Sequence, residues 1–211
     1  MMDELIARLS QRFSEPLPGI KAQMRMSSAL RAEAVSQYKI DASKARTSAV
    51  LIALYPDNGV IRTVLMKRPD YDGTHSGQVS FPGGKKEESD KDVIETALRE
   101  AEEEVAIKPT DVQVIGQLTE LYIPPSNFLV HPIVGILKKV PKLVPDKHEV
   151  EHILQPELNY LFREDIGGEK EVRINNGLKL RTPYFTVDGH TVWGATAMII
   201  SELKEVMASI R

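Results

Sequence analysis

The chain has 211 residues, of which 42% are hydrophobic and 27% charged, so we expect one globular domain and no room for a second full domain. A net charge of −3 argues against a nucleic-acid polymer as substrate, and the absence of cysteine excludes disulfides, thiolate metal sites and a cysteine nucleophile. No apolar run has the length of a signal peptide core or a membrane span, so we expect a cytoplasmic protein without membrane contact.

The first 45 residues are expected to form an N-terminal helical arm on a domain that comprises residues 46–211. Within residues 3–13, apolar side chains recur at the spacing of a helix: Leu5, Ile6, Leu9 and Phe13. A weaker helical pattern covers residues 29–38. We expect this arm to cap the domain, and we consider a homodimer, across which the arm would pack, as the assembly.

The remaining chain alternates strand-like and helix-like segments. Residues 47–55 and 60–66 are β-rich runs joined at Asn58-Gly59, a pair that tolerates the positive φ of a hairpin turn. A short strand at residues 78–81 then leads through glycines into a helical pattern at residues 91–105.

The second half of the chain continues this alternation. The expected elements are strands at residues 112–122 and 128–140, a short helix within 150–162, hairpin turns at 176–177 and 188–189, and a closing helix at 195–210. Helices before, within and after a set of strands predict an α/β fold, in which a mixed β-sheet lies between helices as an α/β/α sandwich.

Three glutamates of the helix at residues 91–105 indicate a metal site. Glu100, Glu103 and Glu104 stand at i, i+3 and i+4, away from the apolar stripe, so we expect their carboxylates as neighbours on an exposed helix face. Like charges at this spacing repel unless a cation joins them, and carboxylate oxygens suit Mg²⁺ or Mn²⁺. The alternative is a merely solvated acidic face. The preceding Gly83-Gly84 favours the metal site, because glycine lets the main chain approach a metal or phosphate.

The segment that begins at Gly84 resembles the box of the Nudix hydrolase family, G-x5-E-x7-R-E-U-x-E-E-x-G-U, where U is a bulky apolar residue. The residues that match this frame are Gly84, Arg99, Glu100, Ala101, Glu103, Glu104 and Ile107. Asp90 stands in place of the first glutamate, and we expect it to cap the helix. The segment before Arg99 is one residue longer, and Ala106 replaces the late glycine.

This resemblance implies a Nudix-type sandwich with a divalent metal at the acidic helix. It implies that Glu100, Glu103 and Glu104 bind Mg²⁺ or Mn²⁺. The carbonyl oxygen of Gly84 would be a further ligand, and Arg99 would hold a glutamate in place.

Segments outside the box are similar to the coenzyme A diphosphatase branch of the family, so that the resemblance covers roughly residues 45–205. These segments are 77–84, G-Q-V-S-F-P-G-G, and 192–197, V-W-G-A-T-A. The branch's upstream pattern, L-L-T-x-R-[SA]-x3-R-x3-G-x3-F-P-G-G, is met in part. Arg68 matches it, whereas Pro69 replaces Ser or Ala and Gly73 replaces the second arginine. The charge missing at Gly73 bears on substrate affinity and leaves the hydrolytic chemistry alone.

Four further residues are candidates for the site. Arg68 suits bidentate phosphate binding, with a surface ion pair as the alternative. His75, in the loop before the box, is either a phosphate contact or a solvated side chain, and Gly83 would offer its backbone to the substrate. Glu149 falls where many Nudix enzymes carry another acidic residue above the metals, as ligand or base, although a charge run near lysines is usually solvated.

The reaction implied is attack of water, activated by the divalent ion, on the diphosphate of a small nucleoside diphosphate derivative, with no covalent intermediate. Coenzyme A or its thioesters are the expected substrates, with 4'-phosphopantetheine and adenosine 3',5'-bisphosphate as products. ADP-ribose, a dinucleotide or a nucleotide sugar is the alternative within the same chemistry. A Nudix module that binds nucleotides without hydrolysis is the alternative of a different class, and the intact acidic triad argues against it.

Overall fold

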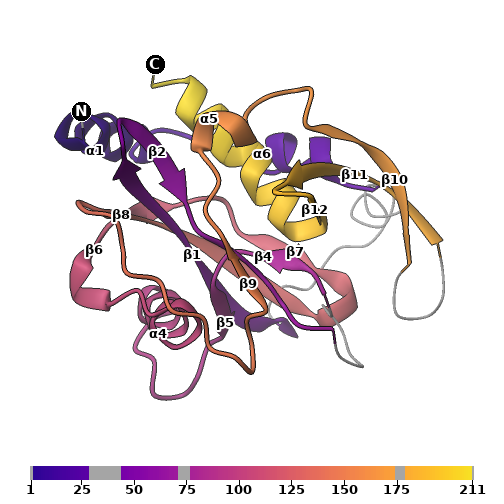
Figure 1. Ribbon diagram of the computed structural model, residues 1–211, viewed down its shortest axis with the longest axis horizontal. Helices are drawn as coiled ribbons and strands as arrows, with labels where there is room; N and C mark the ends of the chain where they lie inside the picture. Colours follow the sequence, from indigo (N-terminus) through magenta and orange to yellow (C-terminus); the bar gives the residue numbers. More distant parts are fainter. Residues whose placement is uncertain (1, 29–43, 71–76, 174–178, 211) are drawn as a thin grey trace.

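A six-stranded mixed sheet forms the centre of the protein in a computed structural model that describes residues 2–28, 44–70, 77–173 and 179–210 (Figure 1). Its order is β2-β1-β8-β6, with β5 beside β1 and β7 beside β8. Strands β1 and β8 run parallel and the other pairs run antiparallel, so the mixed sheet is confirmed. The strands are β1 (Arg46–Asp57), β2 (Val60–Thr63), β5 (Gly83–Lys85), β6 (Val112–Gln117), β7 (Leu121–Ile123) and β8 (Phe128–Leu137).

Two three-stranded antiparallel sheets flank the central one. The first, in the order β4-β3-β9, contains β3 (Leu65–Lys67), β4 (Val79–Ser80) and β9 (His152–Leu154). The second contains β10 (Gly167–Arg173), β11 (Lys179–Val187) and β12 (His190–Trp193). Strands β11 and β12 meet at Asp188 and Gly189, whose φ values of 48° and 79° confirm the expected hairpin turn. The turn expected at 176–177 lies outside the described residues.

Helices cover both faces of the central sheet, because the side chains of β1 alternate between two hydrophobic cores. Ala49 and Leu51 pack in the core of α4 (Val93–Val105), whereas Ile52 and Leu54 pack in the core of α6 (Gly194–Ala208). Figure 1 shows α4 and the yellow α6 on opposite sides of the sheet. The expected sandwich of a sheet between helices is therefore confirmed.

The N-terminal segment packs on the α6 side of the sheet. Helix α1 (Met2–Phe13) buries Leu9 completely in the core that it shares with α6, and the ring of Phe13 lies against Gly116 of β6. Shorter helical turns elsewhere are α2 (Ile20–Gln23), η1 (Met24–Met26), η3 (Pro109–Asp111), η4 (Pro124–Ser126) and α5 (Leu158–Leu161). The helix expected at 29–38 lies outside the described residues, and the boundary between 1–45 and 46–211 stays a prediction.

Two expected strands are interrupted in the structure. The strand expected at 60–66 divides at the fully buried Val64: β2 pairs with β1, and β3 pairs with β4 and β9. The strand expected at 112–122 breaks at residues 118–120, where the hydroxyl of Thr119 donates a 2.6 Å hydrogen bond to buried Glu202 of α6. Side-chain alternation predicts a strand and says nothing about where its pairing is interrupted.

Candidate active site

The glycine segment and the acidic helix form one unit on the edge of the central sheet. Strand β5 pairs with β1 and places Gly84 opposite Ala49. The loop that follows enters α4 at Asp92, whose Oδ1 accepts hydrogen bonds from the amides of Ile94 and Glu95, both at 2.9 Å. Asp92 is therefore the N-cap of the helix. The prediction that Asp90 caps the helix is wrong.

Asp90 instead anchors Arg99. Its buried carboxylate accepts hydrogen bonds from Arg99 Nε and Thr96 Oγ1, each at 2.9 Å. The bond from Arg99 is the main reason why the pKa of Asp90 lies well below its usual range. The anchored guanidinium then contacts Glu100 through Nη2 and Glu103 through Nη1, both at 3.0 Å. Arg99 thus holds two carboxylates of the acidic helix in place.

Glu100 lies directly over Gly84. A Cβ atom at position 84 would come within 2.4 Å of the Glu100 carboxylate, so a larger residue would displace that carboxylate from the main chain. Burial is the main cause that raises the pKa of Glu100; Arg99 opposes this effect, and repulsion from Glu103 and Glu149 adds to it. The Glu100 carboxylate therefore lies against the main chain of Gly84, and a cation would relieve its repulsion from Glu103 and Glu149.

Glu104 is buried, in contrast to the exposed position expected from the sequence, with 2% of its side chain accessible. Its Oε2 accepts a 2.7 Å hydrogen bond from the amide of Gly83, and its Oε1 accepts a 2.9 Å bond from Arg68 Nη2. Burial raises the pKa of Glu104 to about 8, although Arg68 and the Gly83 amide favour the ionised form. Gly83 and Arg68, two of the three residues expected to bind substrate, are thus also contacts of Glu104.

Glu149 reaches the same cluster from a loop. Its Oε2 lies 3.9 Å from Arg68 Nη1, and 59% of its side chain is exposed. The loop is fixed by Asp146, whose amide donates to the Glu104 carbonyl at 2.9 Å and whose Oδ1 accepts from the His148 and Glu149 amides at 2.7 and 3.3 Å. The sequence reading missed Asp146, although aspartate two or three residues before such amides is a common turn signal. His75 lies outside the described residues.

The donors of the cluster fit a hard divalent ion. Among the side chains that the structure describes, no three acidic or histidine groups already surround one point closely enough to hold an ion. The carboxylates contact Arg68 and Arg99, which supply the positive charge. Magnesium commonly takes one or two carboxylates and completes its shell with water and substrate phosphate oxygens. The absence of a side chain at Gly84 lets the Glu100 carboxylate lie against the main chain, which brings a carboxylate and a backbone carbonyl together as oxygen donors.

Comparison with known proteins identifies the family. The family model described as "NUDIX domain" matches residues 45–178. The chain belongs to the Nudix family. "Nudix hydrolase 15, mitochondrial" of Arabidopsis thaliana is 40% identical over 167 residues, which are 76% of this chain and 58% of that protein. "Mitochondrial coenzyme A diphosphatase NUDT8" of Homo sapiens is 32% identical over 164 residues, which are 77% of this chain and 70% of that protein.

Solved structures agree on the fold. A Nudix hydrolase from M. smegmatis, RenU, superposes with a TM-score of 0.54 at 15% identity and covers 79% of this chain and 88% of its own. The resemblance to the Nudix family and its coenzyme A diphosphatase-like branch is confirmed by these relatives. Within the described ranges, none of the helices is long and apolar enough to cross a bilayer. The relatives from Arabidopsis thaliana and Homo sapiens are named as mitochondrial, so the cytoplasmic location stays a prediction.

The box residue Ala106 occupies a position that favours glycine. It ends α4 with φ 60° and ψ 29°, in the left-handed region where a β-carbon costs about 1 kcal/mol or more. We therefore expect Ala106→Gly, which restores the Nudix glycine, to raise the free energy of unfolding by up to about 1 kcal/mol in urea denaturation. Ala106→Val is the control and should lower it, because a β-branched residue fits this region poorly. A less stable Ala106→Gly protein would contradict the prediction.

Proposed function

We propose that the protein hydrolyses the diphosphate bond of coenzyme A or its thioesters, with Mg²⁺ or Mn²⁺ as cofactor. The observation that supports hydrolysis is the gathering of four carboxylates and two guanidinium groups around a glycine segment without side chains. The carboxylates are Glu100, Glu103, Glu104 and Glu149. A module that only binds nucleotides would have no need for this acidic cluster.

The residues of the cluster have separable roles in this proposal. Glu100, Glu103 and Glu104, with the Gly84 carbonyl, would hold the metal, which when bound supplies Lewis-acid activation of water and neutralises charge on the leaving phosphate. Glu149, which is exposed and carried on a loop, would serve as a further ligand or accept the proton of the attacking water. Arg99 keeps its acids in position, and Arg68 would bind the diphosphate oxygens, whereas the Gly83 amide already donates to Glu104.

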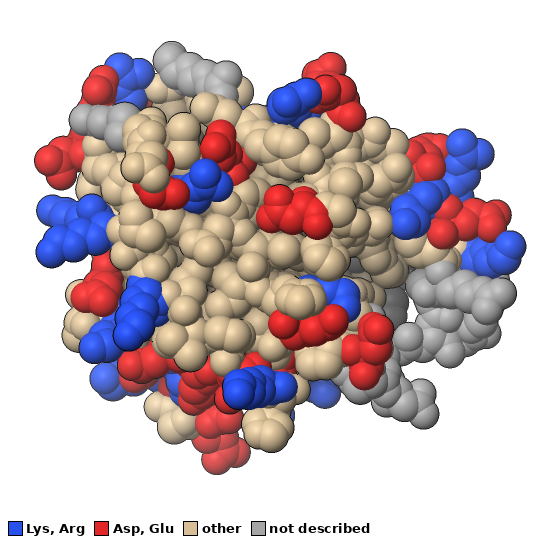
Figure 2. Space-filling view, in the orientation of Figure 1, with Lys and Arg blue, Asp and Glu red and all other residues tan. Residues whose placement is uncertain are grey.

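The name of one relative and two segments of the sequence support coenzyme A as the substrate. The human relative is named for coenzyme A diphosphatase activity, and residues 77–84 and 192–197 are similar to that branch. On the face shown in Figure 2, acidic and basic side chains are mixed, without the broad basic area that a nucleic-acid backbone requires. We therefore propose a small nucleoside diphosphate derivative as the ligand. We also propose a cytoplasmic location and a homodimer, and light scattering tests the homodimer.

A panel of diphosphates tests this function. We expect hydrolysis of coenzyme A to 4'-phosphopantetheine and adenosine 3',5'-bisphosphate with Mg²⁺ or Mn²⁺, and no hydrolysis with EDTA. ADP-ribose, a dinucleotide and a nucleotide sugar serve as competing substrates, and kcat/KM is measured for each. A preference for ADP-ribose above about a hundredfold, near 2.7 kcal/mol in transition-state binding, would contradict the coenzyme A assignment. Nucleotide binding without any hydrolysis would identify a non-catalytic module.

A further inference from the structure

A second polar cluster lies beside the proposed site and takes no part in the hydrolysis described above. Lys67, the last residue of β3, pairs in register with His152 of β9 and forms an ion pair with Glu151. His152 Nε2 lies 3.5 Å from Glu151 Oε1. The rings of His152 and His190, which begins β12, have centroids 6.0 Å apart. Nitrogen-bearing side chains from three strands therefore gather at one carboxylate.

The packing of the flanking sheets explains why these strands meet. Lys67 has Val79 of β4 as its other neighbour in register. The Val79 carbonyl accepts a 2.9 Å hydrogen bond from Thr196 Oγ1 at the start of α6, which fixes the end of β12 beside β4. The amide of Glu151 donates to the Lys67 carbonyl at 2.9 Å, so the backbone holds Glu151 near this position independently of its side chain.

The Glu151 carboxylate occupies the position where nitrogen donors meet. Lys67 donates a hydrogen bond to one oxygen of this carboxylate, and His152 Nε2 lies 3.5 Å from the other. The side chain is 40% exposed, whereas that of Lys67 is 17% exposed. The lysine is thus more firmly enclosed than its acidic partner. An anion with more oxygens and more charge, such as a phosphate monoester, could take the place of the carboxylate.

The position of this cluster relates it to the proposed diphosphate site. Lys67 and Arg68 are adjacent in sequence. Lys67 forms an ion pair with Glu151, and Arg68 approaches Glu149. Glu149 and Glu151 are two residues apart, and two residues of extended chain span at most about 7 Å, so both ion pairs belong to one short segment of the chain. The cluster therefore neighbours Arg68, the proposed contact of the diphosphate, along the chain.

We propose that Lys67, His152 and His190 form a subsite for a phosphate monoester on the ribose of the substrate, with Glu151 as the internal anion that this phosphate displaces. The inference rests on the proposed function, because it assigns the recognition of the 3'-phosphate of coenzyme A to these residues. It also supplies a cationic contact in a chain whose Gly73 lacks the arginine of the related branch.

Calorimetric binding of adenosine 3',5'-bisphosphate and adenosine 5'-monophosphate tests the subsite without catalysis. We expect Lys67→Met to lower the affinity for the bisphosphate about tenfold, because one charge-assisted hydrogen bond is lost, and to leave the affinity for the monophosphate unchanged. His190→Gln should have a smaller effect of the same sign. Glu151→Gln should raise the affinity for the bisphosphate, because it removes the competing anion. Opposite signs for Lys67 and Glu151 distinguish ligand binding from general damage to the fold.

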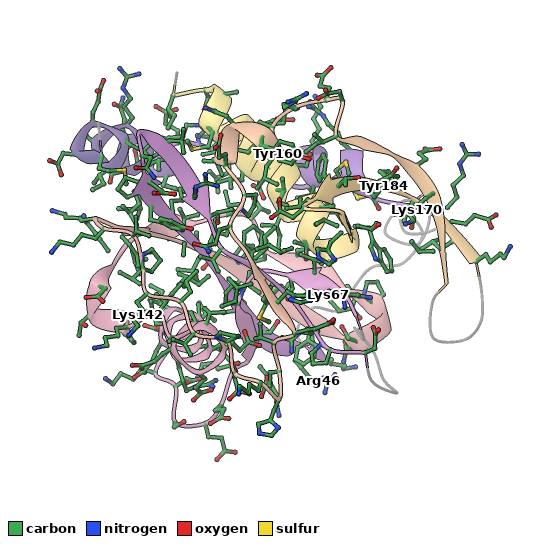
Figure 3. All side chains as sticks on the ribbon, viewed as in Figure 1. Arg46, Lys67, Lys142, Tyr160, Lys170 and Tyr184 are labelled. Atoms are coloured by element: carbon green, nitrogen blue, oxygen red, sulfur yellow. The ribbon has the colours of Figure 1, made fainter. Side chains whose placement is uncertain are left out.

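Lys170→Met is the matched control. Lys170 donates a 2.9 Å hydrogen bond to Thr191, the residue after His190, and Figure 3 shows it beside Tyr184, well apart from Lys67. Its loss should change neither affinity. The subsite would be refuted if Lys67→Met lowered the affinity for both nucleotides equally or for neither. It would also be refuted if inorganic phosphate competed as strongly as the bisphosphate. A further outcome is the expected selective loss of bisphosphate affinity in Lys67→Met together with no hydrolysis of coenzyme A by the protein. This result would refute the proposed function and support the subsite.

Discussion

Replacing Glu103 or Glu104 by glutamine is expected to lower kcat/KM for diphosphate hydrolysis by at least about a hundredfold. Each exchange keeps the shape of the side chain and removes one negative charge from the proposed metal ligands. The several kcal/mol that a divalent ion supplies in the transition state depend on this charge, and about 1.4 kcal/mol corresponds to a factor of ten. Steady-state kinetics over a range of Mg²⁺ and Mn²⁺ concentrations is the measurement.

Glu102→Gln is the control for this pair, because Glu102 is an exposed glutamate on the same helix and lies outside the proposed ligands. It should retain wild-type kinetics and metal dependence. Circular dichroism should show that all three variants are folded, since 60% of the Glu103 side chain is exposed and Glu104→Gln preserves volume at a buried position. Turnover near that of the wild type in Glu103→Gln or Glu104→Gln would refute the role of the helix as a metal platform.

Helical spacing was sufficient to predict which residues of α4 gather, because side chains at i, i+3 and i+4 share one helix face. Glu100 and Glu104 meet the glycine segment, and Glu103 contacts Arg99 of the same helix. The alternation of β1 likewise predicts two buried faces, and helices cover both. Local periodicity and the resemblance to the Nudix box therefore account for the central sheet, its helices and the composition of the site.

The depth of each acid could not be predicted in the same way, because burial depends on segments distant in sequence. Glu104 is buried by the Gly83 backbone and by Arg68, which lies 36 residues earlier. Asp90 and Asp92 both suit a helix cap by residue type, and only the position of Arg99 decides that Asp90 is its anchor. The ion pair between Lys67 and Glu151 spans 84 residues and follows from the pairing of β3 with β9.

The metal-free protein is expected to lose stability as the pH rises from about 5 to about 8, and Glu104→Gln is expected to remove part of that loss. Burial raises the pKa of Glu104 from 4.5 to about 8, so the folded protein binds this proton more tightly than the unfolded chain does. The stabilisation is complete below the unfolded value and is lost as the pH rises through the folded value. Its size is roughly a few kcal/mol, since one pKa unit corresponds to about 1.4 kcal/mol.

Urea unfolding in EDTA at several pH values compares the wild type with Glu104→Gln. Glu100, whose pKa burial also raises, contributes the same trend to both proteins, so the difference between them isolates Glu104. This difference should shift in favour of the variant up to about pH 8 and then stay constant. Adding Mg²⁺ at pH 8 should stabilise the wild type more than the variant, because an ion that binds the folded state needs the ionised carboxylate. Parallel stability curves in EDTA would show that Glu104 titrates normally in the folded protein.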